Sequence, residues 1–419
     1  MSKLDKLLRE LCPDGVECVK LGTLCSLITK QTGFDYTNHI KARLLMEPAE
    51  NAVPYIQTKF FAGKNFNYQT DYYVPMDIVE QFPKITLDEK CILFSIVGAS
   101  IGNVGLFPGE RKCFLGGAIC VAKVLPQYDV DYVYYCVESH NVQHQIRRKT
   151  KGAGQATITV EDIREFEIPL PPIEIQSEIV RILDNFTNLT AELVKELTAR
   201  KTQYGYYRNK FLDFESSVSV KTIGDICDVV VGGEPPTDCI KGDVRDSTHI
   251  YPVWGNGKEV YGYSGTYKID RDAVVISSIG ANTGAVYYKE AFFTPIIRLK
   301  VILPKDNRIN ARFLFHALSG TTIKSKSSSV PNMNANEIKA IKIPVPPLDV
   351  QNRIVNVLDN FEKICSDLNI GLPAEIEARQ KQYEYYRDKL LTFAETGNTI
   401  LSRAEQSRAE QSRAEQSRA

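Results

Sequence analysis

IPLPPIEIQSEIVRILDNF, from Ile168 to Phe186, returns 175 residues later as IPVPPLDVQNRIVNVLDNF, from Ile343 to Phe361, with eleven of 19 positions identical. The similarity resumes at Ala199–Leu212 and Ala378–Leu391, where nine of 14 positions are identical and the offset is 179. A period this long indicates two copies of a domain-plus-helix unit, because solenoid repeats are only ~20 to 50 residues long. We therefore expect two similar helices that present two dissimilar domains.

The repeated stretches predict long helices with a coiled-coil seam. Apolar residues follow a 3,4 spacing over Glu174–Leu212, which would span roughly 58 Å at ~1.5 Å per residue. In the second copy, Gly371 and Pro373 predict a kink or break. The seam positions are Ile179, Leu183, Phe186, Leu193, Leu197, Tyr204 and Tyr207 in the first copy, and Ile354, Leu358, Phe361, Leu368, Tyr383, Tyr386 and Leu390 in the second. We expect the seams to pack on each other; the alternative is that each helix packs only on its own domain.

Each long helix is preceded by the same short elements. Capping boxes, in which an N-cap side chain has an acidic partner three residues later, predict a helical turn at Thr159 with Asp162 and at Asn334 with Glu337. A short alternating strand follows in each copy, and the prolines inside it, Pro169 and Pro344, favour an edge position.

The segments before these elements differ in sequence but share a plan of strand-like runs and a helix, here Asp131–Lys149 in the first copy. We expect an α+β fold with an internal pseudo-two-fold repeat: two mixed domains joined by two long helices in an antiparallel coiled coil. The predicted divisions are a variable domain at 1–165, a helical region at 166–214, a second variable domain at 215–340, a second helical region at 341–395 and a solvated SRAEQ-repeat tail at 396–419.

Composition and motifs exclude several functions. The 51 basic and 51 acidic residues balance, so local patches or partner subunits must supply any binding of nucleic acid. The sequence has no P-loop, GxSxG or HExxH motif, and Glu234-Pro235-Pro236-Thr237 lacks the Asp or Asn and the aromatic residue of an amino-methyltransferase tetrapeptide. We predict no catalytic residue, no metal site and no bound cofactor. Ten cysteines without a CxxC pair, together with the lack of a signal peptide or an apolar span, favour the cytoplasm.

Two features recur in both variable segments and point to DNA. A glycine loop allows close backbone approach to a ligand, and a basic stretch followed by small polar residues has the division of labour expected for phosphate contact and base reading. We also consider corresponding loops before a strand, which contain Tyr55, Gln57 and Lys59 in the first copy and Trp254, Asn256 and Lys258 in the second. The candidate DNA-binding residues are Lys59, Gly98, Ser100, Asn103, Arg147, Arg148, Lys149, Lys151, Gln155, Trp254, Asn256, Lys258, Asn282, Thr283, Lys324, Lys326, Asn332 and Asn334.

The doubled P-P-x-x-x-Q-x-x-I-V-x-x-L-D-x-F pattern, the paired ARKTQYGYYRNKFL-type helix ends and the SIGANTG-type loop resemble the specificity subunits of type I restriction-modification enzymes. The resemblance covers the chain up to the SRAEQ tail. It implies that each variable segment is a target-recognition domain for one half of an asymmetric split site in double-stranded DNA, and that the helices act as a ruler between the halves. It further implies docking of two modification subunits that carry S-adenosylmethionine and methylate adenine. A translocating nuclease subunit can join them.

Two alternatives stay open at this point. One is a scaffold whose coiled coil pairs protein partners, with the variable domains binding peptides. The other is a methyltransferase, which the missing tetrapeptide disfavours.

Overall fold

The computed structural model describes residues 2–33, 35–151, 156–214, 218–243, 245–279, 282–319, 333–367 and 370–392. Its contacts divide the chain into a first unit, Met1–Ala191 with Ala378–Ala419, and a second unit, Glu192–Glu377. Helix α8 (Ile173–Leu212) contributes residues 173–191 to the first unit and 192–212 to the second. The predicted SRAEQ tail lies outside the described residues.

The first unit is built on two four-stranded sheets. One is antiparallel, in the order β2 (Cys25–Lys30), β11 (Ile119–Val124), β8 (Cys91–Ser95), β9 (Val104–Phe107). The other has the order β6 (Tyr73–Pro75), β3 (Ala52–Ile56), β10 (Cys113–Leu115), β7 (Thr86–Leu87), with β3 and β10 parallel. Two-stranded ladders join β1 (Cys18–Lys20) to β12 (Glu167–Pro169) and β4 (Phe61–Ala62) to β5 (Asn65–Phe66).

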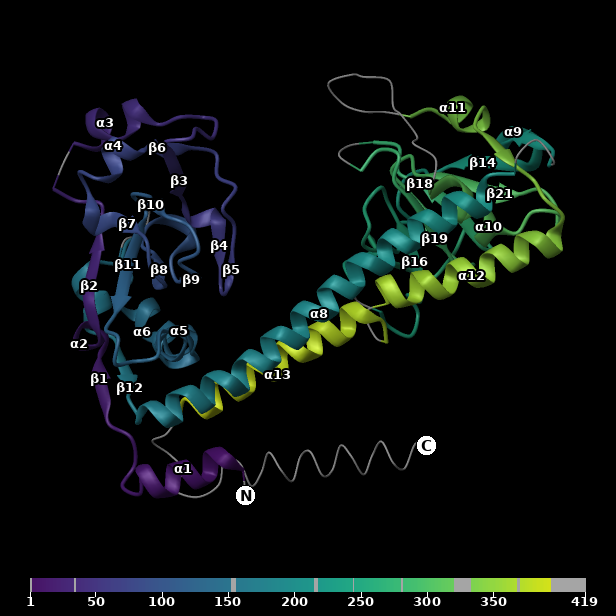
Figure 1. Cartoon of the computed structure of the whole chain (residues 1–419). Coiled ribbons are helices and arrows are strands. Elements are labelled where there is room, and N and C mark those ends of the chain that lie inside the picture. The colour runs from purple at the N-terminus through teal and green to yellow at the C-terminus, as the bar shows by residue number, and fades with distance from the viewer. Residues whose placement is uncertain are drawn as a thin grey trace. The chain divides into compact units, whose positions relative to one another are not determined.

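Short helices connect these strands, and Figure 1 shows α8 leaving the β1–β12 ladder. The α-helices are α1 (Lys3–Leu11), α2 (Leu21–Leu24), α3 (Tyr36–His39), α4 (Met76–Val79), α5 (Val130–Glu138), α6 (His140–Lys149) and α7 (Val160–Arg164). The 3-10 turns are η1 (Lys41–Arg43), η2 (Thr58–Phe60), η3 (Pro83–Ile85) and η4 (Gly98–Ser100).

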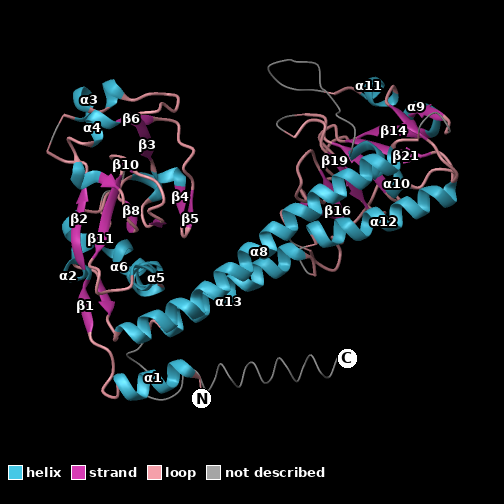
Figure 2. Ribbon diagram, viewed as in Figure 1, coloured by secondary structure: helices cyan, strands magenta, loops and turns pink. Residues whose placement is uncertain are grey.

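The second unit repeats the antiparallel sheet strand for strand and shares three strands of the mixed sheet, whose fourth strand lies at the opposite edge (Figure 2). Its antiparallel sheet has the order β14 (Cys227–Val231), β21 (Lys300–Pro304), β18 (Ala273–Ile276), β19 (Val286–Lys289). Its mixed sheet has the order β15 (Ile240–Lys241), β17 (Gly262–Ser264), β16 (Tyr251–Trp254), β20 (Thr294–Pro295), with β16 and β20 parallel. The remaining elements are β13 (Val220–Thr222), β22 (Lys342–Pro344), α9 (Ile223–Ile226), α10 (Ala311–Ser319), α11 (Ala335–Lys339), α12 (Leu348–Ser366) and α13 (Leu372–Leu390), whose C-terminal part belongs to the first unit.

The antiparallel sheet is buried on both faces in each unit. Along β8, Ile92 and Phe94 join the cluster that contains helices α5, α6 and α8, whereas Leu93 joins the cluster of the mixed sheet. In β18, Val274 and Val275 divide between two clusters in the same way. Burial on both faces explains why these strands read as continuous apolar runs rather than as alternating patterns.

The elements that precede the long helices form as predicted. Both capping boxes are present: the Thr159 hydroxyl accepts from the Asp162 amide and the Asn334 side chain from the Glu337 amide. The strands that contain Pro169 and Pro344 each pair on one side only, as expected of an edge position.

The single helix predicted over Asp131–Lys149 is wrong. It ends at Ser139, whose ψ of 155° is extended, and resumes as α6. The apolar periodicity continues through the break because α5 and α6 both face the same core cluster. Periodicity therefore did not reveal it.

The long helices pair through the predicted seam. In the second unit, the rings of Tyr207 and Phe361 stack at 5.6 Å. Four residues further along α12, burial raises the pKa of the Cys365 thiol, and Lys201 of α8 lies close enough to oppose this shift. Residue numbers therefore rise along α12 while those of its contacts on α8 fall from 207 to 201, so the two helices are antiparallel. In the first unit, Phe186 and Tyr386 stack at 5.3 Å.

Exposure along α8 follows the predicted heptad. Ile179 and Leu183 are buried and Leu193 and Leu197 are partly buried, whereas Val194 is 46% exposed. The second helix is interrupted between α12 and α13, where the Gly371–Pro373 break was expected, and Leu368 lies outside the described residues. Seam residues also pack on the domains, so helix-to-helix and helix-to-domain packing coexist.

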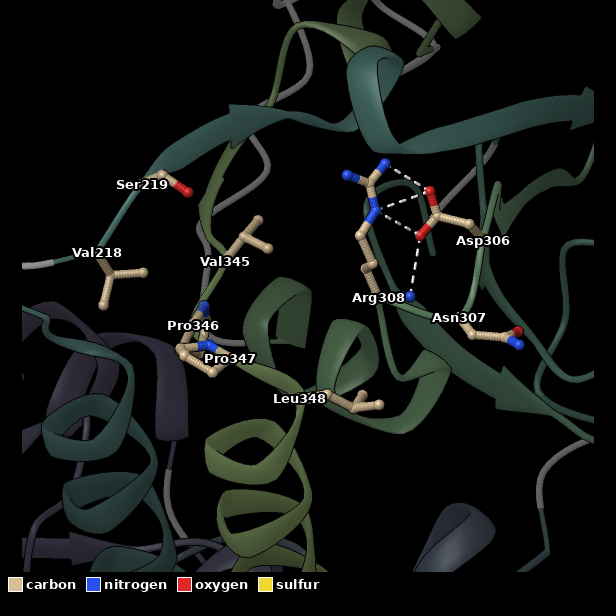
Figure 3. A pocket seen from close by; sticks show the side chains of 9 residues that line it. All are labelled: Val218, Ser219, Asp306, Asn307, Arg308, Val345, Pro346, Pro347 and Leu348. Atoms are coloured by element: carbon tan, nitrogen blue, oxygen red, sulfur yellow. Dashed lines mark hydrogen bonds and ion pairs between the residues drawn. The ribbon is translucent and has the colours of Figure 1, made fainter.

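The repeated glutamine of the P-P-x-x-x-Q pattern ties each domain to its helix. Gln351, fully buried, accepts from the Asn310 amide at 2.9 Å and donates to the carbonyls of Arg308 and Pro346, each at 2.8 Å. Arg308 and Pro346 lie on opposite sides of a pocket of about 700 Å³ at the start of α12 (Figure 3). Gln176 in the first unit makes the equivalent bonds to the Asp129 amide and the Pro171 carbonyl.

The other end of each long helix also contacts a domain. In the second unit, Tyr204 near the end of α8 shares a hydrogen bond of 3.1 Å with His316 Nδ1 on α10. In the first unit, Tyr383 of α13, which matches Tyr204 in the repeat, donates to Glu138 Oε2 on α5 at 2.8 Å. Each unit therefore combines the first part of one repeated helix with the last part of the other.

His316 should make the second unit sensitive to acid. Burial lowers the pKa of His316, although its Nε2 lies 2.7 Å from Asp359, a carboxylate that also pairs with Arg312. Below about pH 6.5 the unfolded chain binds this proton more readily than the folded chain, so stability should fall as the pH drops from about 7.5 to 5. Thermal unfolding of the wild type and of His316→Gln across that range measures the effect. We expect a flatter profile for the variant; equal slopes would assign the pH dependence to other groups.

Within the described part of the chain, no helix is both long enough and apolar enough to cross a bilayer.

Candidate nucleic-acid interface

Three segments of the first unit converge beyond β8. The Gly98 amide of the glycine loop donates to Ala156 at 3.0 Å, and the Ile96 amide donates to Ala118 at 3.0 Å. Lys151 and Thr157 exchange two backbone hydrogen bonds, which places the end of the basic stretch beside the glycine loop. Residues far apart in the sequence thus form one surface.

The second unit assembles the corresponding segments with different side chains. The Ser278 amide donates to Asn256 Oδ1 at 2.8 Å, and the Met333 amide donates to the Ser278 carbonyl at 3.0 Å. The Ser278 hydroxyl donates to the Arg298 carbonyl at 2.8 Å. By strand register, Arg298 occupies the place of Ala118, so equivalent loops meet in both units.

In the first unit, the predicted residues fall into exposed and internally bonded groups. Asn103, Arg147, Arg148 and Lys151 are exposed. Two candidates are held internally: Ser100 Oγ lies 2.6 Å from Ser95 Oγ, and Lys149 Nζ donates to the Asp162 carbonyl at 3.4 Å. Lys59 is exposed and forms a surface ion pair with Asp71. Gly98 has a φ of 79° with open space around its Cβ position, so a glycine suits the backbone there. Gln155 lies outside the described residues.

In the second unit, Lys258 and Asn282 are exposed, and Thr283 is partly buried. The amide of Asn256 is used inside the protein, because it bonds Ser278 and donates to the Ile297 carbonyl. Asn334 uses its side-chain oxygen as the N-cap of α11. Lys324, Lys326 and Asn332 lie outside the described residues.

Trp254 and Tyr55 lie in strands β16 and β3, so the prediction that they belong to loops is wrong. Parallel pairing with β20 and β10 extends each strand to these residues. Trp254 instead lines a pocket of about 970 Å³. The Lys289 ammonium stands 2.9 Å from the centroid of its ring, and burial lowers the pKa of Lys289 to about 8.

Sequence reasoning missed polar residues that line the converging loops. A pocket of about 440 Å³ in the first unit contains Gln31, Thr32 and Tyr36 beside Tyr55 and Gln57. Gln31 donates to the Leu115 carbonyl at 2.5 Å. In the second unit, Ile297 and Arg298 were also missed. They lie beside Asn256 and Ser278 because β16 pairs with β20, and the sequence alone does not show that pairing.

One cluster could suit a cation. Ligand atoms of His316, Asp359 and Glu362 lie within 4.8 Å of one another. The guanidinium of Arg312 already pairs with both carboxylates, so a metal ion would have to displace it. We therefore assign no metal to this cluster.

The doubled fold, with a different loop surface in each unit, defines a two-domain recognition protein built on paired helices. A family model described as the type I restriction modification DNA specificity domain matches residues 13–200 and 215–378. The chain belongs to this family.

Known relatives agree with this assignment. The chain is 36% identical over 258 residues to the specificity subunit of the type I restriction enzyme EcoR124I/EcoR124II from Escherichia coli, covering 55% of this chain and 63% of that subunit. It is 34% identical over 257 residues to the putative type I specificity subunit S.MpnORF89P of Mycoplasma pneumoniae, covering 57% of this chain and 76% of that protein. The chain thus spans less than two thirds of the Escherichia coli subunit.

A solved structure shares the fold. The S subunit of a type I restriction-modification system from M. genitalium aligns with a TM-score of 0.54 and 19% identity, over 90% of this chain and 97% of that one. At this identity the match concerns the fold: two mixed domains and long paired helices.

Proposed function

We propose that this chain is the non-catalytic DNA-reading subunit of a type I restriction-modification complex. Each unit reads one half of a split target in double-stranded DNA through its converging loops. The observation that carries the proposal is that the shared antiparallel sheet and parallel strand pair assemble equivalent loops in both units, yet the loops carry different side chains. Different readers in the two units require an asymmetric target.

Exposed cations support contact with phosphates. Arg147, Arg148 and Lys258 are exposed, and none of them pairs with a carboxylate among the residues that the structure describes. Unpaired surface cations can neutralise phosphates at little cost in broken ion pairs.

The outer faces of the helices support docking of two copies of a protein partner. Large apolar residues are exposed at matching places in both repeats: Leu189 (48%) with Ile364 (40%), and Tyr206 (60%) with Tyr385 (55%). Exposed apolar residues that recur in this way favour protein contacts over chance exposure. We assign these faces to two modification subunits, which bring S-adenosylmethionine and the adenine methylation, with a translocating nuclease subunit as a further partner. The complex acts on DNA in the cytoplasm.

Binding to random double-stranded DNA, with and without the co-expressed modification subunit, tests this function. We expect binding with the partner present, weakening at least about tenfold between 50 and 200 mM salt because counterions are released. Sequencing of methylated positions in a host that expresses the pair should reveal one asymmetric split site. A chain that binds the partner but never DNA would instead be a protein scaffold.

A further inference from the structure

Ile297 and Arg298 form an unusual turn in the second unit. Both have a left-handed backbone, with φ of 52° and 58°, and both side chains are exposed. A left-handed conformation is costly for a residue with a Cβ and most costly for a β-branched one such as isoleucine. Their amides donate to the carbonyls of Gly233 at 2.9 Å and Gly232 at 3.1 Å. The turn is therefore held in place from its backbone side.

The carbonyls of the turn are held equally firmly. Asn256 donates to the Ile297 carbonyl, while the buried Ser278 and the buried Lys300 donate to the Arg298 carbonyl at 2.8 Å and 3.0 Å. Strained backbone persists only where the surroundings over-determine it, and such places cluster at binding sites. Asn256 and the buried Ser278 and Lys300 thus hold a turn whose two side chains face solvent.

The turn also carries uncompensated positive charge. Lys300 is 6% exposed, and burial, with a smaller contribution from Arg298, lowers its pKa. Among the residues that the structure describes, no carboxylate pairs with Lys300 or Arg298. A cation held behind an exposed guanidinium favours an electron-rich partner in front of it.

The equivalent turn of the first unit has neither feature. Gly117 and Ala118 stand in the places of Ile297 and Arg298, and no cation is present at either position. The two units therefore differ at this turn in charge, size and backbone conformation. A difference of this kind is what separate sequence preferences require.

We propose that Arg298 is a specificity-determining residue of the second unit and donates hydrogen bonds to the major-groove edge of a guanine, with Ile297 packed beside it. Arginine is the side chain best suited to this edge, because its planar fork matches guanine N7 and O6. The inference rests on the DNA-reading function proposed above and adds the residue and the base.

Three variants test it in the full complex with the modification subunit. Arg298→Gly removes the side chain and suits the left-handed backbone; Arg298→Lys keeps the charge and loses the fork. Arg271→Gly is the control, because Arg271 is also exposed, pairs with its neighbour Asp270 and precedes β18, whereas Arg298 contacts Ser278 beyond the other end of that strand. Binding is measured to the target found by methylation sequencing and to each of its single base-pair changes.

We expect both Arg298 variants to lose about tenfold or more of the discrimination at one G·C pair in the second half-site, with the first half-site unaffected. Arg298→Gly should also raise the unfolding midpoint by about 2 to 4 °C, because it relieves backbone strain. A purely structural turn would not combine greater stability with poorer selectivity. Unchanged discrimination in both variants overturns the inference while leaving the DNA-reading function intact; a wild-type complex without sequence preference overturns both.

Discussion

Replacing Gln351 by alanine is expected to destabilise the second unit by about 3 kcal/mol. The side chain is fully buried and makes three hydrogen bonds, to the Asn310 amide and to the carbonyls of Arg308 and Pro346. Alanine leaves these backbone groups without a partner and too deep for easy access by water. Each such group costs on the order of 1 to 3 kcal/mol, and the space left by the side chain adds to the loss.

Hydrogen exchange measures this effect locally, because the two units need not unfold together. Exchange in α10 and α12 should accelerate about 100-fold, whereas β8 and β11 of the first unit should exchange as in the wild type. Gln176→Ala should produce the mirror image with a smaller loss, since Gln176 makes two such bonds. Gln380→Ala is the control, because Gln380 is exposed and bonds only Glu384 in the described part of the chain. Equal effects of Gln351→Ala and Gln380→Ala would refute a stabilising role of the buried Gln351 hydrogen bonds.

Gly116→Ala should destabilise the first unit by about 3 kcal/mol or more. A Cβ at this position would lie 2.2 Å from the Ile56 carbonyl oxygen. Both residues belong to the closely paired β3 and β10 region, so the obstacle is backbone and cannot rotate away. The strands would have to separate, which would also displace the converging loops of the first unit.

The neighbouring Gly117 is the matched control, because a Cβ there meets only the end of the Gln31 side chain, at 3.3 Å. Gly117→Ala should therefore cost less than about 1 kcal/mol. Thermal unfolding compares stability, and methylation sequencing compares the target. For Gly116→Ala we expect loss of selection at the first half-site with the second half-site retained. If Gly116→Ala and Gly117→Ala behave alike, the close approach of the backbone is not what selects glycine at position 116.

The predictions from sequence were most accurate where the signal is local. The seam, the capping boxes, the Gly371–Pro373 break and the shared plan of the variable segments all follow from spacings of a few residues or from the comparison of two copies. The break at Ser139 was missed because apolar residues continue at helical spacing on both sides of it. Trp254 was placed in a loop because only its pairing with β20 makes it part of a strand.

The candidate site was only partly within reach of the sequence. The sequence singled out the glycine loop and the basic stretch, and the first unit does place these segments side by side. Their contact with DNA stays a prediction. Within the basic stretch, Arg147 and Arg148 are exposed, whereas the partly buried Lys149 donates to the Asp162 carbonyl. No motif marked Ile297 or Arg298.

By itself the sequence determined that the chain is doubled, that its constant parts are helices with a coiled-coil seam, and that its variable parts differ. Those properties depend on the spacing of residues three or four positions apart or on the comparison of two copies, and both kinds of information are contained in the linear sequence. Only the tertiary structure decided which side chains meet at the converging loops of each unit. Asn256, Ser278, Arg298 and Met333 meet because β16 pairs with β20 and β18 pairs with β21, and these long-range pairings leave no local trace in the sequence.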